Sequence, residues 1–428
     1  MEDQPVVTGF LHNRGDVLLV KRSNAVGSYP GLWGGVAGHA CGVPSNAIRR
    51  EIREETGIDP VESCDLVRAG EPFHVPDPKL DTRWIVHPFR FDCETRNVVT
   101  NWESETYEWV PPTEILRRET VPKLWGSYDT VRPTVETVAT DTDHGATYIS
   151  YRALDVLRDE AALRHESVDK FQDSIDIVAD SLRKARPSMT AVRNRINRVM
   201  AACGDGESFA PAAIEATARD EIDRADGMDR ATVSALADEI DGKRVATVSR
   251  SGTVLQALLA GEVSAVLVAQ SRPGGEGASV AATLEDEVDV TLTSDAAFGS
   301  ELVEWGADVL VFGADTILPN GDVLNKVGSR TWAIVADHEG ISVLVGTSSD
   351  KIAHDRRIDV EPRPPEELSV NSPLVEIVNP TFDVTPAGLV SSYITERGAI
   401  TREDIRNIAS EHEENDRKAT NRYVRSGG

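Results

Sequence analysis

The stretch that decides the fold of the C-terminal half reads VLVFGADTILPNGDVLNKVGS and covers residues 309–329. Its four leading apolar residues, Val309–Phe312, predict a buried strand, and Asp315 follows the end of that strand. Because open α/β sheets hold ligands beyond the carboxyl ends of their strands, Asp315 is expected to face a ligand. An Asn-Gly turn then returns Asn325 and Lys326 to the same edge. The stretch therefore predicts a polar binding site at the edge of a parallel sheet.

Short β-rich runs alternate with helix-forming segments beyond residue 242, which predicts a parallel, doubly wound sheet. The expected strands are Val245–Val248, Ala265–Ala269, Val288–Leu292, Val309–Phe312, Trp332–Val335 and Ile341–Val345. Residues 150–240 lack such runs and show helical periodicity. The expected helices there are Ile149–Arg158, Val168–Lys184 and Thr190–Ala201.

Polar residues follow each of the first four expected strands. The turn Ser249–Gly252 follows the first strand and begins a helix, so its amides, hydroxyls and guanidinium suit a phosphate group. The candidate ligand-binding residues are Arg250, Ser251, Arg272, Asp295, Asn325 and Lys326, and Asp315 follows the fourth strand beside them. Taken singly, each segment is also compatible with an ordinary strand-to-helix loop.

An acidic helix is predicted at Ser45–Gly57, close to the N-terminus. Helical spacing places Glu51, Glu54 and Glu55 on one narrow face. Three carboxylates on one face repel one another unless a cation neutralises them, and hard oxygen ligands suit Mg²⁺ or Mn²⁺. A solvated acidic face is the alternative interpretation. Strands are expected around this helix at Pro5–Leu11, Asp16–Lys21 and Trp84–Phe91.

The order REIREETGI at residues 50–58 resembles the core of the Nudix hydrolase signature, and the resemblance covers about the first 140 residues. It implies an α/β/α sandwich that hydrolyses a nucleoside-diphosphate derivative. It also implies a metal ion held by Glu51, Glu54 and Glu55, with Glu54 acting in catalysis.

Two features qualify this resemblance. Gly42 stands where the Nudix pattern has a glutamate, which implies reduced or shifted activity. In some Nudix enzymes a glutamate from a late loop is the general base, and Glu103 and Glu105 are the candidates here. Exposed loop charge is the alternative interpretation of both residues.

A second resemblance covers roughly residues 160–400. It is to the family of the alpha, beta and delta subunits of translation initiation factor 2B, ribose-1,5-bisphosphate isomerase and methylthioribose-1-phosphate isomerase. The segments that carry it are Ala185–Asn197, Ser271–Gly277, Gly313–Ser329, Asn379–Pro386 and Ile394–Gly398. The resemblance implies a module that binds a ribose phosphate or a nucleotide, and a homodimer or higher oligomer formed through the last two segments.

The isomerases of that family use a cysteine in the first loop and an aspartate in the Gly-Ala-Asp loop. Asp315 is present, but Ser249 stands at the cysteine position. A thiol with a pKa of about 8.5 exchanges protons near neutrality, whereas an alkyl hydroxyl needs strong activation. Two alternatives to a plain binding module therefore stay open. One is a non-catalytic regulatory subunit with a translation-factor partner, and the other is an active ribose-1,5-bisphosphate isomerase with another proton carrier.

The composition limits the classes of function. Lys and Arg number 45 against 71 Asp and Glu, and the net charge of −26 argues against general nucleic-acid or membrane-surface binding. Such acidity is typical of a protein adapted to a high-salt cytoplasm, or of an ordinary acidic protein. The four cysteines indicate neither a disulfide framework nor a zinc site. No run is long and apolar enough for a membrane span, and we expect a cytoplasmic protein.

These observations predict an α/β multi-domain protein. Residues 1–140 are expected to form the Nudix hydrolase domain. Residues 141–240 are expected to form a linker and the helical subdomain of the initiation factor 2B-like module. The short, polar and acidic stretch Thr137–Gly145 is typical of a linker. Residues 241–428 are expected to form a Rossmann-like, doubly wound domain that binds a sugar phosphate or a nucleotide and includes the C-terminal segment.

Overall fold

The computed structural model of the chain describes residues 1–164, 168–204, 209–368 and 374–420. The chain divides into two compact units. Unit 1 comprises Met1–Thr134 and Asp155–His165, and unit 2 comprises Val135–Leu154 and Glu166–Gly428. The prediction of an α/β multi-domain protein is confirmed. No helix within the described ranges is long and apolar enough to cross a membrane.

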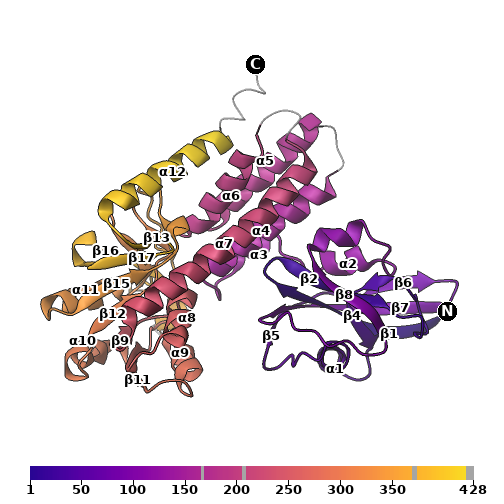
Figure 1. Cartoon of the computed structure of the whole chain (residues 1–428), viewed down its shortest axis with the longest axis horizontal. Coiled ribbons are helices and arrows are strands. Elements are labelled where there is room, and N and C mark those ends of the chain that lie inside the picture. The colour runs from indigo at the N-terminus through magenta and orange to yellow at the C-terminus, as the bar shows by residue number, and fades with distance from the viewer. Residues whose placement is uncertain (165–167, 205–208, 369–373, 421–428) are drawn as a thin grey trace. The chain divides into compact units, whose positions relative to one another are not determined.

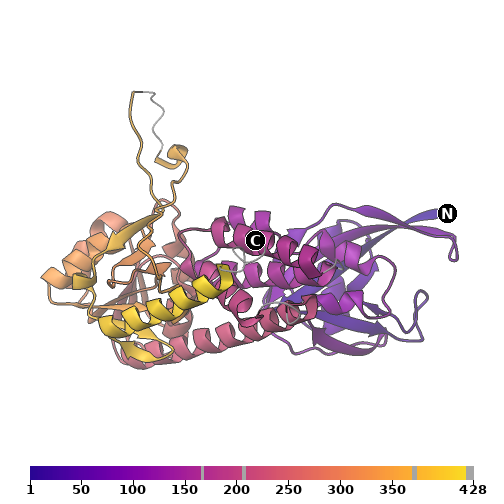
Figure 2. The ribbon, with the colours of Figure 1, turned by 90° about the horizontal axis from the view of Figure 1, so that it is seen from above.

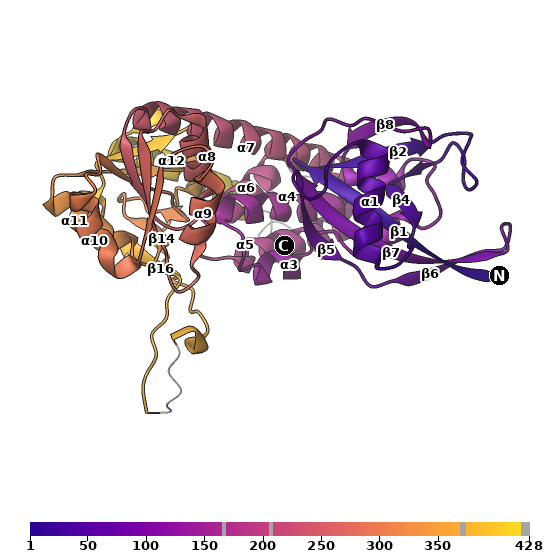
Figure 3. The same cartoon turned by 90° about the horizontal axis from the view of Figure 1, so that it is seen from below.

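Unit 1 is built on an eight-stranded sheet in which β1 and β7 pair in parallel. The elements are β1 (Glu2–Asn13), β2 (Asp16–Arg22), β3 (Trp33–Gly34), β4 (Val36–His39), α1 (Pro44–Thr56), β5 (Cys64–Ala69), β6 (Phe73–Asp77), β7 (Thr82–Cys93), β8 (Ser104–Val110), η1 (Pro112–Leu116) and α2 (Leu124–Asp129). Helix α1 lies across the strands (Figure 3), and its Ile48 and Ile52 share a buried core with Val7 and Leu11 of β1. The strands expected from alternation lie within β1, β2 and β7.

The ends of α1 follow from its sequence. Val43 is the N-cap and Pro44 the first helical residue, where the missing amide hydrogen of proline costs nothing. Gly57 ends the helix in the left-handed conformation, with φ of 69°. The predicted helix is therefore confirmed.

A disulfide joins Cys64 on β5 to Cys93 on β7, and it corrects the expectation of a chain without one. The two cysteines are 29 residues apart in sequence, but they are directly opposed in the antiparallel pair β5–β7. Spacing along the chain does not reveal this pairing, because it depends on the register of two strands.

Unit 2 combines a helical part with a seven-stranded sheet (Figure 1). Its helical elements before the sheet are α3 (Val135–Thr140), α4 (Ala146–Leu163), whose residues from Asp155 belong to unit 1, α5 (Val168–Ala185), α6 (Thr190–Ala202) and α7 (Pro211–Ile240). The remaining elements are β9 (Arg244–Thr247), α8 (Gly252–Ala260), β10 (Ala265–Ala269), α9 (Glu276–Leu284), β11 (Val290–Thr293), α10 (Asp295–Glu304), β12 (Val309–Phe312), β13 (Thr316–Ile317), β14 (Val323–Lys326), α11 (Ser329–His338), β15 (Ser342–Gly346), η3 (Ser349–Lys351), η4 (Pro365–Leu368), β16 (Phe382–Thr385), η5 (Ala387–Leu389), β17 (Ser392–Thr395), β18 (Gly398–Ile400) and α12 (Arg402–Thr420). Figure 2 shows α12 beside the helical part of unit 2 and η4 on a projecting part of the chain.

The large sheet of unit 2 has the strand order β11-β10-β9-β12-β15-β17-β18, with only β18 antiparallel to its neighbour. The order reverses between β9 and β12. This is the topological switch point of a doubly wound sheet, where the loops after the two strands diverge and leave a crevice at the carboxyl edge. The predicted Rossmann-like sheet is confirmed.

The two faces of this sheet bury different sets of side chains. On β12, Leu310 and Phe312 pack with residues of α10 and α11, whereas Val309 and Val311 pack with residues of α7, α8 and α9. Because both faces are covered by helices, β10 and β12 are apolar throughout and do not alternate with polar residues.

Two expectations for unit 2 are corrected. The apolar run Trp332–Val335 lies on helix α11, not on a strand, because Trp332, Ala333 and Ala336 share its buried face at helical spacing. The expected linker between residues 137 and 145 is partly helical, since Val135–Thr140 forms α3.

A buried ionic network joins the helical part to the sheet of unit 2. Asp350 of η3 has no exposed side-chain surface. Its carboxylate accepts hydrogen bonds from Arg195 at 2.9 Å, Arg198 at 2.6 Å and Arg224 at 3.0 Å. Removing one partner of such a network leaves the other charges buried and uncompensated.

We expect Asp350→Ala to lower the free energy of unfolding of unit 2 by about 3–5 kcal/mol, because the buried Arg195 would lose its ion pair of 2.9 Å and be left with the longer pair to Asp229, at 3.4 Å. Asp180→Ala, which breaks the exposed ion pair with Lys184, is the matched control and should cost under about 1 kcal/mol. Urea denaturation of the full chain, followed by circular dichroism, measures both. Equal losses in the two variants would contradict this account of the network.

Candidate functional site

A pocket of roughly 600 Å³ opens at the carboxyl edge of the unit 2 sheet. Residues Val248–Gly252, after β9, and Ala314 with Asp315, after β12, form its floor at the switch point. Asn325 and Lys326 of β14 complete this side. The structure thus brings five of the predicted site residues together in one cavity: Arg250, Ser251, Asp315, Asn325 and Lys326.

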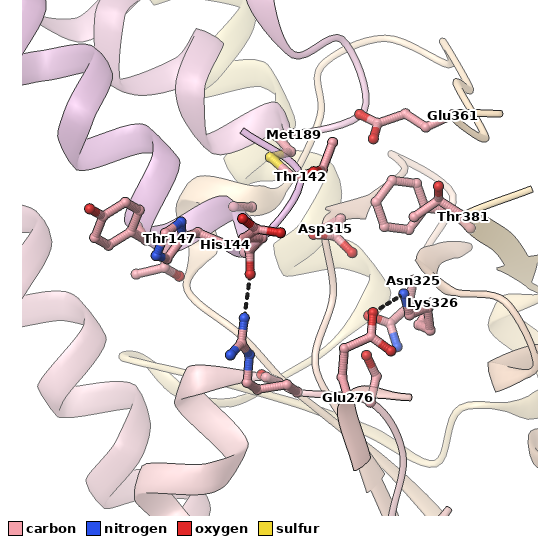
Figure 4. Close-up of a pocket in the computed structure, with 18 of the residues that line it drawn as sticks. Thr142, His144, Thr147, Met189, Glu276, Asp315, Asn325, Lys326, Glu361 and Thr381 are labelled. Carbon is pink, nitrogen blue, oxygen red and sulfur yellow. Dashed lines mark hydrogen bonds and ion pairs between the residues drawn. The ribbon is translucent and has the colours of Figure 1, made fainter. Parts of the chain in front are cut away.

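The opposite walls come from segments far away in the sequence. Residues 142–148 and Tyr151 line the pocket from the start of α4, and Arg186 and Met189 line it from the segment before α6. Glu361 and the prolines beside it contribute a further wall. Figure 4 shows Glu276, Asn325 and Lys326 on one side of Asp315 and His144 on the other.

Asp315 opens onto the middle of this pocket with the buried Lys351 nearby. Burial raises the pKa of Asp315, and the charge of Lys351 opposes that rise. Burial likewise lowers the pKa of Lys351, with the charge of Asp315 acting against it. The two groups therefore stabilise each other's charged forms in a poorly solvated place.

The turn after β9 is held in an unusual conformation. Ser249 has a positive φ of 59°, which a residue with a side chain adopts only where its surroundings fix it. Its amide donates to the hydroxyl of Ser271 at 2.6 Å. Ser251 caps α8, and a side chain at position 313 would collide with Ser251, so Gly313 allows the two loops to approach. The Arg250 guanidinium donates to the carbonyl of Asp143.

Most cations around the pocket are already paired with acids. The pairs are Arg186 with Glu361 at 2.9 Å, Arg363 with Glu367 at 2.7 Å, and Lys326 with Glu276. Arg250 makes no ion pair with any described residue. The pocket is therefore closer to neutral than a count of its basic residues suggests.

Two predicted ligand residues lie elsewhere. Arg272 and Asp295 are not among the residues that line the pocket. The Asp295 carboxylate instead accepts the amides of Ser271 and Arg272, both at 2.7 Å, and braces the loop after β10. The structure thus places Asp295 in a supporting position, and the role of Arg272 stays a prediction.

In unit 1, helix α1 presents its acids in three different surroundings. Glu54 is exposed, at 58% of its side-chain surface. Glu51 pairs with Arg50 at 2.7 Å and lies against Gly38, where any larger residue would collide with its carboxylate. Glu55 is buried and accepts the amide of Ala37 at 3.2 Å.

The pKa of Glu55 is raised to about 8, chiefly by burial and in smaller part by the charges of Glu103 and Glu51. Glu103 and Glu51 are therefore the acids that act electrostatically on Glu55. Glu105, the other loop candidate, faces away from them and pairs with Lys21 at 3.0 Å. In the described part of the chain, no three acidic, histidine or cysteine side chains form a ready-made metal site.

Gly42 has a positive φ of 84° and open space around it. A residue with a side chain would be strained in this conformation. The loop before α1 thus has a backbone conformation that favours glycine at position 42, where the Nudix pattern has glutamate.

Sequence reasoning missed several residues that line the unit 2 pocket. His144 stacks on Tyr148 with ring centroids 4.0 Å apart, and both line the cavity with Lys351, Glu276 and Glu361. His144 lies in a stretch that reads as linker. Glu361 lies in a segment with no regular periodicity. Of these residues, only Glu276 lies in a segment that the sequence analysis singled out, the glycine-rich loop Ser271–Gly277 after β10.

Comparison with known families supports two modules. Residues 142–402 match the Initiation factor 2 subunit family, and residues 2–131 match the NUDIX domain. The chain is 28% identical over 321 residues to a methylthioribose-1-phosphate isomerase of Syntrophotalea carbinolica, covering 67% of this chain and 92% of the relative. It is 37% identical over 169 residues to the enzyme of the same name from Pseudomonas entomophila, covering 37% of this chain and 47% of the relative. The chain thus spans about half the length of some of its relatives.

Solved structures share the fold of unit 2. Translation initiation factor eIF-2B of Pyrococcus horikoshii superposes with a TM-score of 0.55 at 23% identity, covering 63% of this chain and 97% of that one. The 5-methylthioribose 1-phosphate isomerase of the same organism gives 0.52 at 22% identity, covering 72% and 89%. A tetrameric eIF2B beta and delta complex of Chaetomium thermophilum gives 0.53 at 20% identity, covering 70% and 98%. At these identities the likeness concerns the fold alone.

Proposed function

The chain belongs to the initiation factor 2 subunit family and carries a Nudix domain, and on this premise we propose a function for each unit. Unit 2 binds a phosphorylated ribose or a nucleotide in the pocket at its sheet edge. Unit 1 is a metal-dependent hydrolase of a nucleoside-diphosphate derivative. The observation that carries the first proposal is the meeting of polar residues from several strand ends in one cavity at the switch point.

The phosphate group of the ligand is assigned to the turn at the start of α8. Arg250 lines the cavity without a carboxylate partner among the described residues, and the first amides of α8 follow it directly. Helix amides and a guanidinium together make a favourable anion site. The sugar then extends past Asp315 toward Asn325.

A second function, isomerase catalysis in the same pocket, is supported by the relatives named methylthioribose-1-phosphate isomerase and by the position of Asp315. Ser249 weighs against it, since an unactivated hydroxyl is a poor proton carrier. Binding without turnover would make unit 2 a sensor, as in a regulatory subunit with a translation-factor partner.

For unit 1, the donor chemistry fits a hard divalent cation. Glu55 is buried without an ion pair among the described residues, and the charged groups that raise its pKa most are acids. We assign Mg²⁺ or Mn²⁺ to Glu51, Glu54 and Glu55. When bound, such an ion supplies charge neutralisation for a pyrophosphate. Glu103 is the better candidate than Glu105 for accepting a proton, because only Glu103 acts electrostatically on Glu55.

We also propose that unit 2 forms a homodimer through Asn379–Pro386 and Ile394–Gly398, as expected from the sequence. The solved relative described as a tetrameric complex supports oligomer formation in this family.

We expect Arg250→Ala to remove most of the rise in melting temperature that ribose 5-phosphate or a nucleoside monophosphate causes through binding linkage. A charge-assisted hydrogen bond contributes about 1.5–3 kcal/mol. Arg417→Ala is the matched control and should keep the shift, because its exposed ion pair with Glu414 lies outside the pocket. Arg272→Ala tests the ligand contact that the sequence predicts for Arg272. Should neither compound stabilise the wild type, the pocket does not bind phosphorylated ribose.

Asp315→Asn tests catalysis separately from binding. The change keeps the shape of the side chain and removes the proton carrier, so calorimetric affinity should change little. A ketose-product assay with ribose 1,5-bisphosphate then decides between the two functions of unit 2. Turnover in the wild type that is lost in Asp315→Asn supports the isomerase, whereas binding without turnover supports the sensor.

Metal-dependent hydrolysis is tested across a panel of nucleoside-diphosphate compounds. We expect Glu54→Gln and Glu55→Gln to lower the Mg²⁺-dependent rate by about a hundredfold or more. Glu105→Gln should leave the rate within about threefold, since that carboxylate pairs with Lys21. A wild type that hydrolyses none of the compounds with Mg²⁺ or Mn²⁺ would rule out the hydrolase function.

A further inference from the structure

One end of the unit 2 pocket is closed by an ion pair inside the cavity. Lys326 is 6% exposed, and its ammonium group contacts the carboxylate of Glu276, the first residue of α9. The carboxylate lies against Gly274, where an added side chain would displace it. The positive charge of Lys326 is therefore neutralised before a ligand arrives.

Glu276 also carries an unused acceptor. Its Oε2 atom is buried and has no hydrogen-bond partner among the described residues. A carboxylate only accepts hydrogen bonds, and a buried acceptor without a donor costs free energy. A quarter of the Glu276 side-chain surface stays exposed, and a ligand hydroxyl can donate to the carboxylate from that side. A second phosphate is unfavourable there, because its oxygens are acceptors and its charge repels the carboxylate.

The other side of the pocket has the opposite character. Arg250 is fixed there by the carbonyl of Asp143, beside His144, and lacks a carboxylate partner among the described residues. Helix α8 begins there at Gly252, beside which an added side chain would meet open space, and the Ser251 hydroxyl already accepts the amide of Val254. Figure 4 shows His144 and the Glu276–Lys326 pair on different sides of Asp315. One side thus suits a phosphate and the other suits hydroxyl groups.

We propose that Glu276 determines the specificity of this pocket, admitting phosphorylated riboses with a single phosphate and rejecting those with a second phosphate at the Lys326 end. The inference rests on the proposed function of unit 2 as a binder of phosphorylated ribose. It identifies the ligand class as a ribose monophosphate whose phosphate lies at Arg250 and whose hydroxyls donate to Glu276.

The test is calorimetric titration of the full chain with ribose 5-phosphate and with ribose 1,5-bisphosphate. The wild type should bind the monophosphate about tenfold more tightly or better. Glu276→Gln keeps the size of the side chain and removes the negative charge that neutralises Lys326. It should shift the ratio of the two dissociation constants by about tenfold toward the bisphosphate.

Glu414→Gln is the matched control, because Glu414 also pairs with a cation, Arg417, but neither residue lines the pocket. The ratio should stay unchanged in this variant. An equal shift in Glu414→Gln, or none in Glu276→Gln, overturns the assignment to Glu276.

Two further results separate this inference from its premise. A wild type that binds the bisphosphate as tightly as the monophosphate contradicts the role of Glu276 and leaves the phosphorylated-ribose pocket intact. If neither the wild type nor Glu276→Gln binds either compound, both the pocket assignment and the specificity fail. Melting temperatures of the free variants show that each is folded.

Discussion

The arrangement of unit 2 depends on the buried carboxylate of Asp350 and the arginines that surround it. Arg195 and Arg198 come from α6 and Arg224 from α7, so one carboxylate ties two helices to the loop after β15. Buried charges tolerate only arrangements that keep them paired, which leaves these helices little freedom to slide over the sheet. The next residue, Lys351, is thereby placed in the pocket opposite Asp315.

The two units treat buried acids in contrasting ways. Burial by itself raises the pKa of Asp350, but the charges of Arg198 and Arg195 outweigh it and hold the pKa below its usual value. In unit 1, burial and, less strongly, acidic neighbours raise the pKa of Glu55 to about 8. A buried acid with cationic partners is typical of a structural ion pair. A buried acid with acidic neighbours is typical of a functional site.

The pocket of unit 2 shows how a strongly acidic chain can serve an anionic ligand. The whole chain has a net charge of −26, which argues against general attraction of anions, so an anionic ligand must be recognised by local groups in the pocket. Ion pairs with Glu361, Glu367 and Glu276 neutralise most cations around the cavity, while Arg250 keeps its charge available. Among these cations, a positive charge is thus available to the ligand only at Arg250, and shape and hydrogen bonds determine which ligands fit elsewhere in the pocket.

The sequence by itself determined the class of fold, the order of the modules and the strand ends that carry the site. Apolar strands buried on both faces and helices with caps are local patterns, which is why β10, β12 and α1 were predicted closely and Asp315, Asn325 and Lys326 were placed at one edge. Only the tertiary structure decided which side chains meet. Four contacts join residues distant in the chain: the pairing of Lys326 with Glu276, the electrostatic effect of Glu103 on Glu55, the disulfide between Cys64 and Cys93, and the entry of residues 142–148 into the pocket. Such contacts depend on strand register and helix packing, and therefore no short stretch of sequence predicts them.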